Sequence, residues 1–196
     1  MIRDEVAQLH YITPIANVPS ILQNGLLSHA RAAGHRHRSI AMSDVQGRRA
    51  LRSIPGGRRL HEYVNLYFDA RNPMMYSRRE SHEALCVLRV ANAVLDLPGV
   101  AIADQNASTD FVRFYPSPDG LAALDRTLVF AEFWTDSNPL EYRRRKAARC
   151  AEVLVPDRVE PCYIQGAFVS CARARAALAE IAPLFAVEEL PRMFFQ

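Results

Sequence analysis

Residues 64–76 read Val64-Asn65-Leu66-Tyr67-Phe68-Asp69-Ala70-Arg71-Asn72-Pro73-Met74-Met75-Tyr76, and the rest of the chain is best interpreted around them. Apolar and polar residues alternate at the start of this stretch, which is typical of a half-buried strand. The strand ends at an Arg-Asn-Pro break, and two methionines and a tyrosine follow at once. Soft and aromatic side chains at a strand end suit a planar ligand, while the plainer interpretation is a core strand followed by a surface turn.

Length and composition favour one domain covering residues 1–196. Apolar residues make up 49% of the 196, which is ample for a core, and no run of about 18 apolar residues predicts a membrane span. The first residues, Met1-Ile2-Arg3-Asp4-Glu5, have no apolar secretory core behind them. We therefore expect a cytoplasmic protein, and we expect a monomer because no heptad pattern or exposed apolar helix stands out.

The cysteines and the charge are less specific. Cys86, Cys150, Cys162 and Cys171 form no CxxC pair, so buried free thiols are expected rather than a zinc site or disulfides. Lys146 is the only lysine among 24 basic residues, so the other 23 are arginines. Arginine forks suit phosphates and stack on bases, which weakly favours a nucleic-acid partner at a net charge of +3.

The pattern along the chain predicts an α+β fold with a largely antiparallel or mixed sheet. There is no GxGxxG, P-loop, HExxH or GxSxG motif, and strands and helices do not alternate regularly. Strands are expected at 9–13, from 64 to the Arg-Asn-Pro break at 71–73, 84–90, 100–104, 152–155 and 162–169. Helical segments are expected at 18–24, from Ser43 or Asp44 to about 52, 121–134, 138–149 and 173–184.

Two polar regions are candidates for binding. Residues 28–38 are predicted to be a loop, and their histidines lack the regular spacing and neighbouring ligands of a metal site. Residues 105–150 mix polar, basic and aromatic side chains, which suits a single-stranded nucleic acid. The basic run within 143–149 has an alternative interpretation as a solvated helix face. Glu152 begins an apolar strand, where a carboxylate needs a partner or a functional reason.

Five stretches in order resemble the DarT family of DNA ADP-ribosyltransferases, the toxins of DarT–DarG toxin–antitoxin pairs. The resemblance covers nearly the whole chain. The stretches are Tyr11-Ile12-Thr13…Asn17-Val18-Pro19-Ser20-Ile21-Leu22…Gly25; Ser39-Ile40-Ala41…Gln46-Gly47-Arg48-Arg49; Leu60-His61-Glu62-Tyr63-Val64…Tyr67-Phe68…Arg71-Asn72-Pro73-Met74-Met75-Tyr76; Asp104…Asn106-Ala107…Arg113-Phe114-Tyr115; and Arg143-Arg144-Arg145-Lys146…Ala151-Glu152-Val153-Leu154-Val155.

The resemblance implies an ADP-ribosyltransferase fold with a split, curved sheet, peripheral helices and NAD in a central cleft. It implies transfer of ADP-ribose from NAD to thymidine or guanosine in single-stranded DNA, without a metal, and a macrodomain ADP-ribosylglycohydrolase as antitoxin. By position Glu152 matches the catalytic glutamate and Arg49 the catalytic arginine, with Arg48 as the alternative. Residues 28–49 match an NAD-binding element, and residues 105–151 match a substrate-recognition region.

The same resemblance assigns contact residues. The expected NAD contacts are His10, Tyr11, Ile12, Thr13, Arg49, Tyr67, Met75 and Tyr76. The expected DNA contacts are Asn106, Arg113, Tyr115, Arg143, Arg144, Arg145 and Lys146.

One departure concerns the first strand, where many relatives carry His-x-Thr. Here Tyr11-Ile12-Thr13 holds that register, with the histidine one place earlier at His10. Successive strand residues face opposite sides, so His10 and Tyr11 cannot both face a ligand through their side chains. Two alternatives stay open beside DNA modification. One is a transferase of this fold that acts on RNA or protein, and the other is a nucleic-acid-binding module without catalysis.

Overall fold

The central strand predicted from Val64 to the break at 71–73 is present as β3, Tyr63–Tyr67, in the middle of a large sheet, and it ends before that break. The structure is a computed structural model that describes residues 1–196. The eight-stranded sheet has the order β10-β9-β4-β1-β3-β7-β5-β6, and a two-stranded sheet pairs β2 with β8. The strands are β1 Gln8–Pro14, β2 Leu26–Leu27, β3 Tyr63–Tyr67, β4 Leu85–Ala91, β5 Ala101–Ala103, β6 Phe114–Pro116, β7 Glu152–Pro156, β8 Arg158–Val159, β9 Ile164–Val169 and β10 Val187–Glu189.

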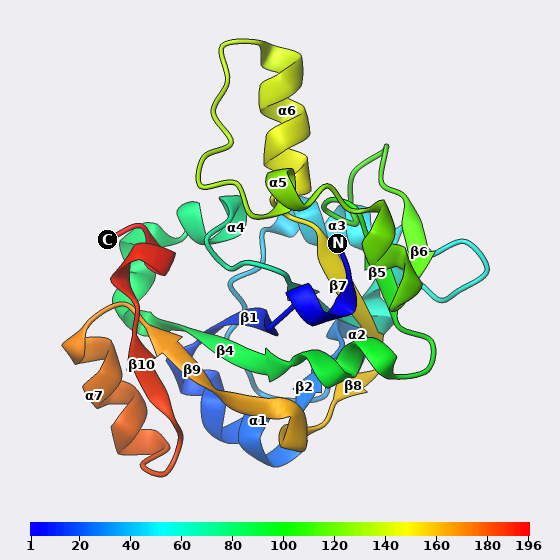
Figure 1. The fold of residues 1–196 in the computed structure, drawn as a ribbon. Coiled ribbons are helices and arrows are strands. Elements are labelled where there is room, and N and C mark those ends of the chain that lie inside the picture. Colours follow the sequence, from blue (N-terminus) through cyan, green and yellow to red (C-terminus); the bar gives the residue numbers. More distant parts are fainter.

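Seven α-helices lie around the sheet (Figure 1). They are α1 Val18–Asn24, α2 His29–Ala32, α3 Ser43–Ala50, α4 Pro73–Tyr76, α5 Arg126–Val129, α6 Pro139–Ala148 and α7 Ala172–Ile181. Helix α6 stands out from the body of the molecule, with α5 near its foot (Figure 1). None of the helices combines the length and apolar content that a bilayer crossing requires.

The sheet is split where β1 meets β3. β1 pairs with β4 along seven residue pairs, but it pairs with β3 only where His10 lies opposite Tyr67. β3 continues instead beside β7 for five residue pairs. All pairings in the large sheet are antiparallel except the parallel one between β9 and β10. The expected split, mixed sheet of an α+β fold is therefore confirmed.

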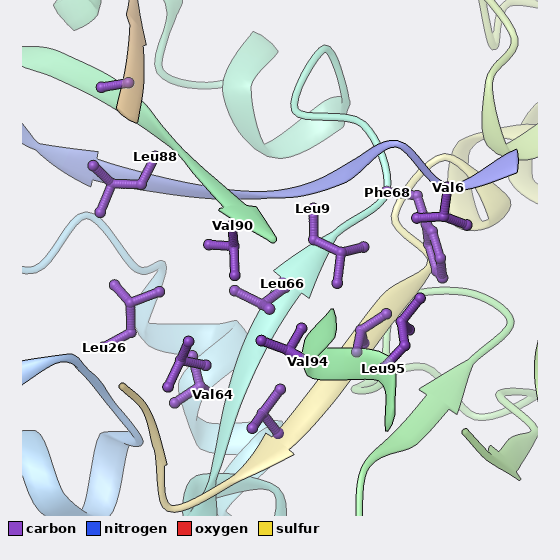
Figure 2. Close-up of a cluster of buried hydrophobic side chains, with 14 of the residues drawn as sticks. Val6, Leu9, Leu26, Val64, Leu66, Phe68, Leu88, Val90, Val94 and Leu95 are labelled. Carbon is purple, nitrogen blue, oxygen red and sulfur yellow. The ribbon is translucent and has the colours of Figure 1, made fainter. Parts of the chain in front are cut away.

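The main core covers one face of this sheet. Leu9, Leu66 and Leu88 come from three different strands and are fully buried, and Figure 2 shows these side chains among the apolar residues that surround them. In a strand alternate residues face alternate sides, so the residues between them, such as His10 and Tyr67, face the other side. The opposite face of the central strands carries smaller apolar clusters, and among them the buried polar side chains of His10 and Glu152.

Several local predictions hold and others are wrong. Helix α1 carries Pro19 in its first turn and ends at Gly25, whose φ of 79° is of the kind that glycine adopts without strain. Residues 28–38 were expected to be all loop, but Ser28 caps the short helix α2. Helix α3 begins at Ser43 with Met42 at the N-cap, because the Met42 carbonyl already accepts the first helical hydrogen bond, from the Gln46 N–H at 3.0 Å; the prediction of Ser43 or Asp44 as the cap is wrong.

The helix predicted at 121–134 is the largest error. Only α5 and a 3₁₀ turn at Asp119–Ala123 form there, because Leu124 and Asp125 are extended and the Asp125 carboxylate caps a new helix start. Leu121, Leu124 and Val129 are apolar because they pack into the core, not because they share one helix. Strand β10 was not predicted, since it has only three residues and two of them are glutamates.

Candidate active site

The strand register gathers polar side chains on the sheet face opposite the main core. His10 of β1 lies opposite Tyr67 of β3, and Tyr67 lies opposite Glu152 of β7. Directly opposite residues in antiparallel strands share one face, with Cβ atoms about 4.5–5.5 Å apart. Three of the residues singled out from the sequence therefore form one row across the split sheet.

The carboxylate of Glu152 is fully buried and closely held. Arg49 Nη1 donates to Glu152 Oε2 at 2.9 Å and to Oε1 at 3.2 Å. The backbone N–H of Ala107 also donates to Oε1, at 3.2 Å. A buried carboxylate is tolerated only with such partners. Here the positive charge of Arg49 and the backbone N–H of Ala107 both stabilise it.

Helix α3 delivers Arg49 to this carboxylate. The Arg49 residue is 5% exposed, whereas its neighbour Arg48 faces solvent, so only one of the two arginines reaches Glu152. Arg49 Nη2 is buried and has no hydrogen-bond partner. A buried unpaired donor is costly, and this one gives Arg49 a free hydrogen bond beside the carboxylate.

Burial and nearby charges shift the pKa values of Tyr67 and His10, the two other members of the row. Burial, followed by the charge of Glu152, raises the pKa of Tyr67 well above its ordinary value, so this phenol stays protonated. Burial lowers the pKa of His10 despite the opposing charge of Asp69. The His10 ring nitrogens lie 3.1 Å from the Phe68 carbonyl and 3.1 Å from Gln8 Nε2, so both are occupied within the protein.

A small cavity opens beyond the split, beside β1. Its volume is about 60 Å³, and it is lined by Tyr11, Thr13, Asn17, His35 and His37 together with residues of α1, α2 and β2. Asn17 fixes the loop above it, since its amide exchanges two 2.9 Å hydrogen bonds with the backbone of Arg38. Tyr11 and Thr13 thus face this cavity.

The other expected NAD contacts lie elsewhere. His10 faces the other side of β1, and Ile12 is buried in an apolar cluster. Met75 has no exposed surface, because it packs with Ile12 and Tyr67 in that cluster. Tyr76 is 45% exposed and lines a separate, larger cavity.

The expected DNA contacts divide between a loop and α6. Asn106 accepts hydrogen bonds from the backbone and hydroxyl of Ser108, which shapes the loop that brings Ala107 to Glu152. Arg113 is exposed without an ion pair, and Tyr115 on β6 is half-buried. Phe111, at the end of the same loop, is 89% exposed.

On helix α6 the positive charges are not equivalent. Arg144 pairs with Asp125 and Glu141, and Arg145 pairs with Asp136. Arg143 is exposed and has no ion pair, and Lys146 lies over the Tyr142 ring. Only part of this basic run therefore carries charge that is not already paired.

Two functional features were missed from the sequence. One is the backbone N–H of Ala107, which no side-chain pattern reveals. The other is Arg149, whose buried guanidinium pairs with Asp69 Oδ2 at 3.0 Å and donates to the carbonyls of Arg71 and Val129. Arg149 could have been singled out because it lies beside the apolar segment Cys150–Val155, where a charge must be paired.

The cysteines give a test of this packing. All four are free, but Cys162 is exposed, so the expectation of uniformly buried thiols is wrong; it lies in a 3₁₀ turn outside the sheet. Burial raises the pKa of Cys86 and of Cys150 to about 12. At pH 8 we expect iodoacetamide to label Cys162 readily in the native protein and to label Cys86 and Cys150 only after unfolding, as read by peptide mass spectrometry. Rapid native labelling of Cys150 would contradict the buried geometry beside Glu152.

The split, mixed sheet with its peripheral helices matches solved structures of ADP-ribosyltransferases. A solved structure of Thermus sp. 2.9 DarT in complex with ADP-ribosylated ssDNA superposes with a TM-score of 0.83 at 26% identity, covering 97% of each chain. The same Thermus protein in complex with NAD+ gives a TM-score of 0.79 at 25% identity, covering 97% of this chain and 98% of that one.

The chain belongs to the DarT family: the model of that family, described as ssDNA thymidine ADP-ribosyltransferase, matches residues 10–194. A DNA ADP-ribosyl transferase of Thermus sp. is 32% identical over 74% of this chain and 73% of its own length. A DNA ADP-ribosyl transferase-DNA ADP-ribosyl glycohydrolase fusion protein of Thermosipho africanus is 31% identical over 83% of this chain. The chain spans only 42% of that fusion protein.

Proposed function

We propose that this protein transfers ADP-ribose from NAD+ to thymidine in single-stranded DNA and releases nicotinamide. The observation that carries the proposal is the buried pairing of Glu152 with Arg49 at the split of the sheet, in a chain of the DarT family. A relative with the same fold, Thermus sp. 2.9 DarT, has been solved with NAD+ and with ADP-ribosylated ssDNA. Thymidine is preferred to guanosine because the family description names it.

In the proposed reaction Glu152 acts on the ribose. Departure of nicotinamide breaks its bond to the ribose C1′ and leaves an oxocarbenium-like centre, which a carboxylate stabilises electrostatically. The new bond joins C1′ to the ring nitrogen of thymine that carries a proton, and that proton is released to water. The free Nη2 of Arg49 would hold the acceptor base or a phosphate, and Ala107 would keep Glu152 oriented.

For NAD+ the proposed contacts are Tyr11 and Thr13. They line the cavity beside β1, so Tyr11 takes the place of the histidine that many relatives carry. A cavity of about 60 Å³ is far below the roughly 300–1,000 Å³ of small-molecule sites. We therefore propose that residues 28–42 move away from β1 when NAD+ binds, which would break the hydrogen bonds between Asn17 and Arg38.

DNA is proposed to lie across the loop 105–113 and the base of α6. Exposed Phe111 offers a stacking surface, and unpaired Arg113 and Arg143 offer positive charge to phosphates. Arg144 and Arg145 are weaker candidates, since contact with DNA would compete with their ion pairs.

The cellular role is proposed by analogy with the Thermosipho africanus fusion protein, which joins a transferase to a glycohydrolase. This chain would be the toxin, and a macrodomain ADP-ribosylglycohydrolase would be the antitoxin that reverses its modification. Four free cysteines suit the reducing cytoplasm, where we propose that it acts as a monomer.

The test is to incubate the purified protein with NAD+ and a single-stranded oligonucleotide, and to measure the intact mass of the DNA. We expect the mass to rise by one ADP-ribose, and we expect no gain on a matched strand in which every thymidine is replaced by cytidine. Fragmentation then locates the modified base. Release of nicotinamide without DNA modification would indicate an RNA or protein acceptor. Binding of DNA without any use of NAD+ would indicate a binding module.

A further inference from the structure

A larger cavity lies apart from the small cavity beside β1. It has a volume of about 540 Å³, and its walls come from α4 and its flanks, from residues 130–132, from Arg149 and from residues 192–196. The range of roughly 300–1,000 Å³ that small-molecule sites occupy includes this volume. Nothing in the proposed roles above uses it.

Arginines and aromatic rings make up much of its wall. The Arg71 guanidinium lies 4.1 Å from the centroid of the Phe195 ring, and that of Arg79 lies 4.3 Å from the Tyr76 ring. The Tyr76 and Phe195 rings meet edge to face with centroids 5.1 Å apart. Arginine stacked on aromatic rings is a surface on which bases stack while the charge meets phosphate.

The charge of the cavity favours an anionic ligand. Four arginines line it, against the two carboxylates Asp69 and Glu132. Asp69 is paired with Arg149, whose Nε is buried without a hydrogen-bond partner. Arg192 is exposed and makes no ion pair, so its guanidinium is available to a phosphate.

The cavity is also close, along the chain, to Tyr67 and Glu152 of the row across the split sheet. Asp69 follows Tyr67 by two residues, and Arg149 precedes Glu152 by three. Segments of two or three residues span at most about 7–11 Å. A strand of DNA with its target base at Glu152 would therefore reach this cavity with a neighbouring nucleotide.

We propose that this cavity is a subsite for a nucleotide that flanks the modified thymidine, with its base against the Tyr76 and Phe195 rings and its phosphate at Arg192. This inference rests on the proposed function. It predicts that the protein binds a strand of several nucleotides rather than a single target base. Since stacking and phosphate contact do not depend on which base is present, the subsite would contribute affinity more than sequence preference.

The test uses two variants and a matched control. Arg192→Glu reverses the exposed charge, and Phe195→Leu keeps an apolar side chain but removes the aromatic face. Arg173→Glu makes the same charge change at an 81% exposed side chain on α7, where it also removes an exposed ion pair with Glu83. The KM for DNA and the kcat are measured on a long oligonucleotide with one central thymidine, and on strands truncated on either side of that thymidine.

We expect Arg192→Glu and Phe195→Leu to raise the KM for the long strand by roughly tenfold, with kcat changed less than twofold. Arg173→Glu should change neither value by more than about twofold. Truncation on one side should raise the wild-type KM similarly and abolish the difference between wild type and the two variants.

Equal KM values for Arg192→Glu and Arg173→Glu, or an equal defect on every truncated strand, would overturn the subsite. If the wild-type protein modifies no DNA, the proposed function fails. Binding of a fluorescent oligonucleotide then tests separately whether the cavity binds a nucleotide. Weaker binding by Arg192→Glu than by Arg173→Glu would then support the subsite, and equal binding would overturn it.

Discussion

Glu152→Gln is expected to lower the rate of ADP-ribose transfer by about 10²–10⁴-fold, the range typical of a positioned electrostatic or acid–base group. The amide keeps the shape of the side chain, and an oxygen at the Oε1 position can still accept from Arg49 and from the Ala107 N–H. The negative charge is lost, and the amide nitrogen replaces the oxygen that accepts the shorter hydrogen bond from Arg49. The readout is the intact mass of the DNA over time. Glu180→Gln, at an exposed position of α7 without an ion pair, is the matched control and should keep the wild-type rate.

Stability separates Glu152→Gln from Glu152→Ala. Alanine leaves the Arg49 guanidinium buried without its partner, which costs about 3–5 kcal/mol in the free energy of unfolding. Urea unfolding should therefore show a large loss for alanine and a smaller one for glutamine, although both variants lose transfer. A glutamine variant that transfers ADP-ribose within tenfold of the wild-type rate would contradict the role proposed for Glu152.

Arg149→Ala is expected to have the second large effect, on folding. The Arg149 side chain is fully buried and links three segments, because it reaches the Asp69 carboxylate and the carbonyls of Arg71 and Val129. Alanine would leave that carboxylate and both carbonyls without their donor. We expect a loss of about 3 kcal/mol, and a fall in Tm of roughly 6–12 °C at about 2–4 °C per kcal/mol.

Arg149→Lys tests the geometry of this link. A lysine ammonium is a compact point charge and cannot hold three acceptors in the fork that a guanidinium provides, so lysine should recover only part of the lost stability. Arg144→Ala removes an exposed arginine from α6 and should cost less than about 1 kcal/mol. Equal unfolding midpoints for Arg149→Ala and Arg144→Ala, measured in urea, would show that the buried link does not stabilise the fold.

Elements with regular apolar patterns could be predicted from the sequence. Strands β1, β3, β4 and β7 were found because their alternation or apolar runs reflect burial within the sheet. Helix α6 was found because Asn138 and Pro139 mark its start, and the Asn138 side chain does cap it. Where apolar residues pack into the core from irregular backbone, as in residues 121–134, periodicity misleads.

The candidate site could be predicted only in part. Glu152 stood out because a carboxylate beside an apolar strand needs a partner, and that partner is Arg49. Strand alternation predicts that His10 and Tyr11 point to opposite sides of β1. Which of the two faces the cavity depends on where β1 separates from β3. The contact of the Ala107 backbone N–H with Glu152, and the buried link that Arg149 makes, depend on tertiary contacts between segments far apart in the chain.

The two outer strands of the large sheet have a further consequence for how copies of the protein behave together. An exposed sheet edge is a template on which another chain can add a strand, and proteins avoid this with short edges, charges and proline. Here β10 at one edge is three residues long and carries Glu188 and Glu189, and β6 at the other edge is three residues long and ends at Pro116. Both edges thus oppose polymerisation, and the folded protein should resist edge-to-edge aggregation even at high concentration.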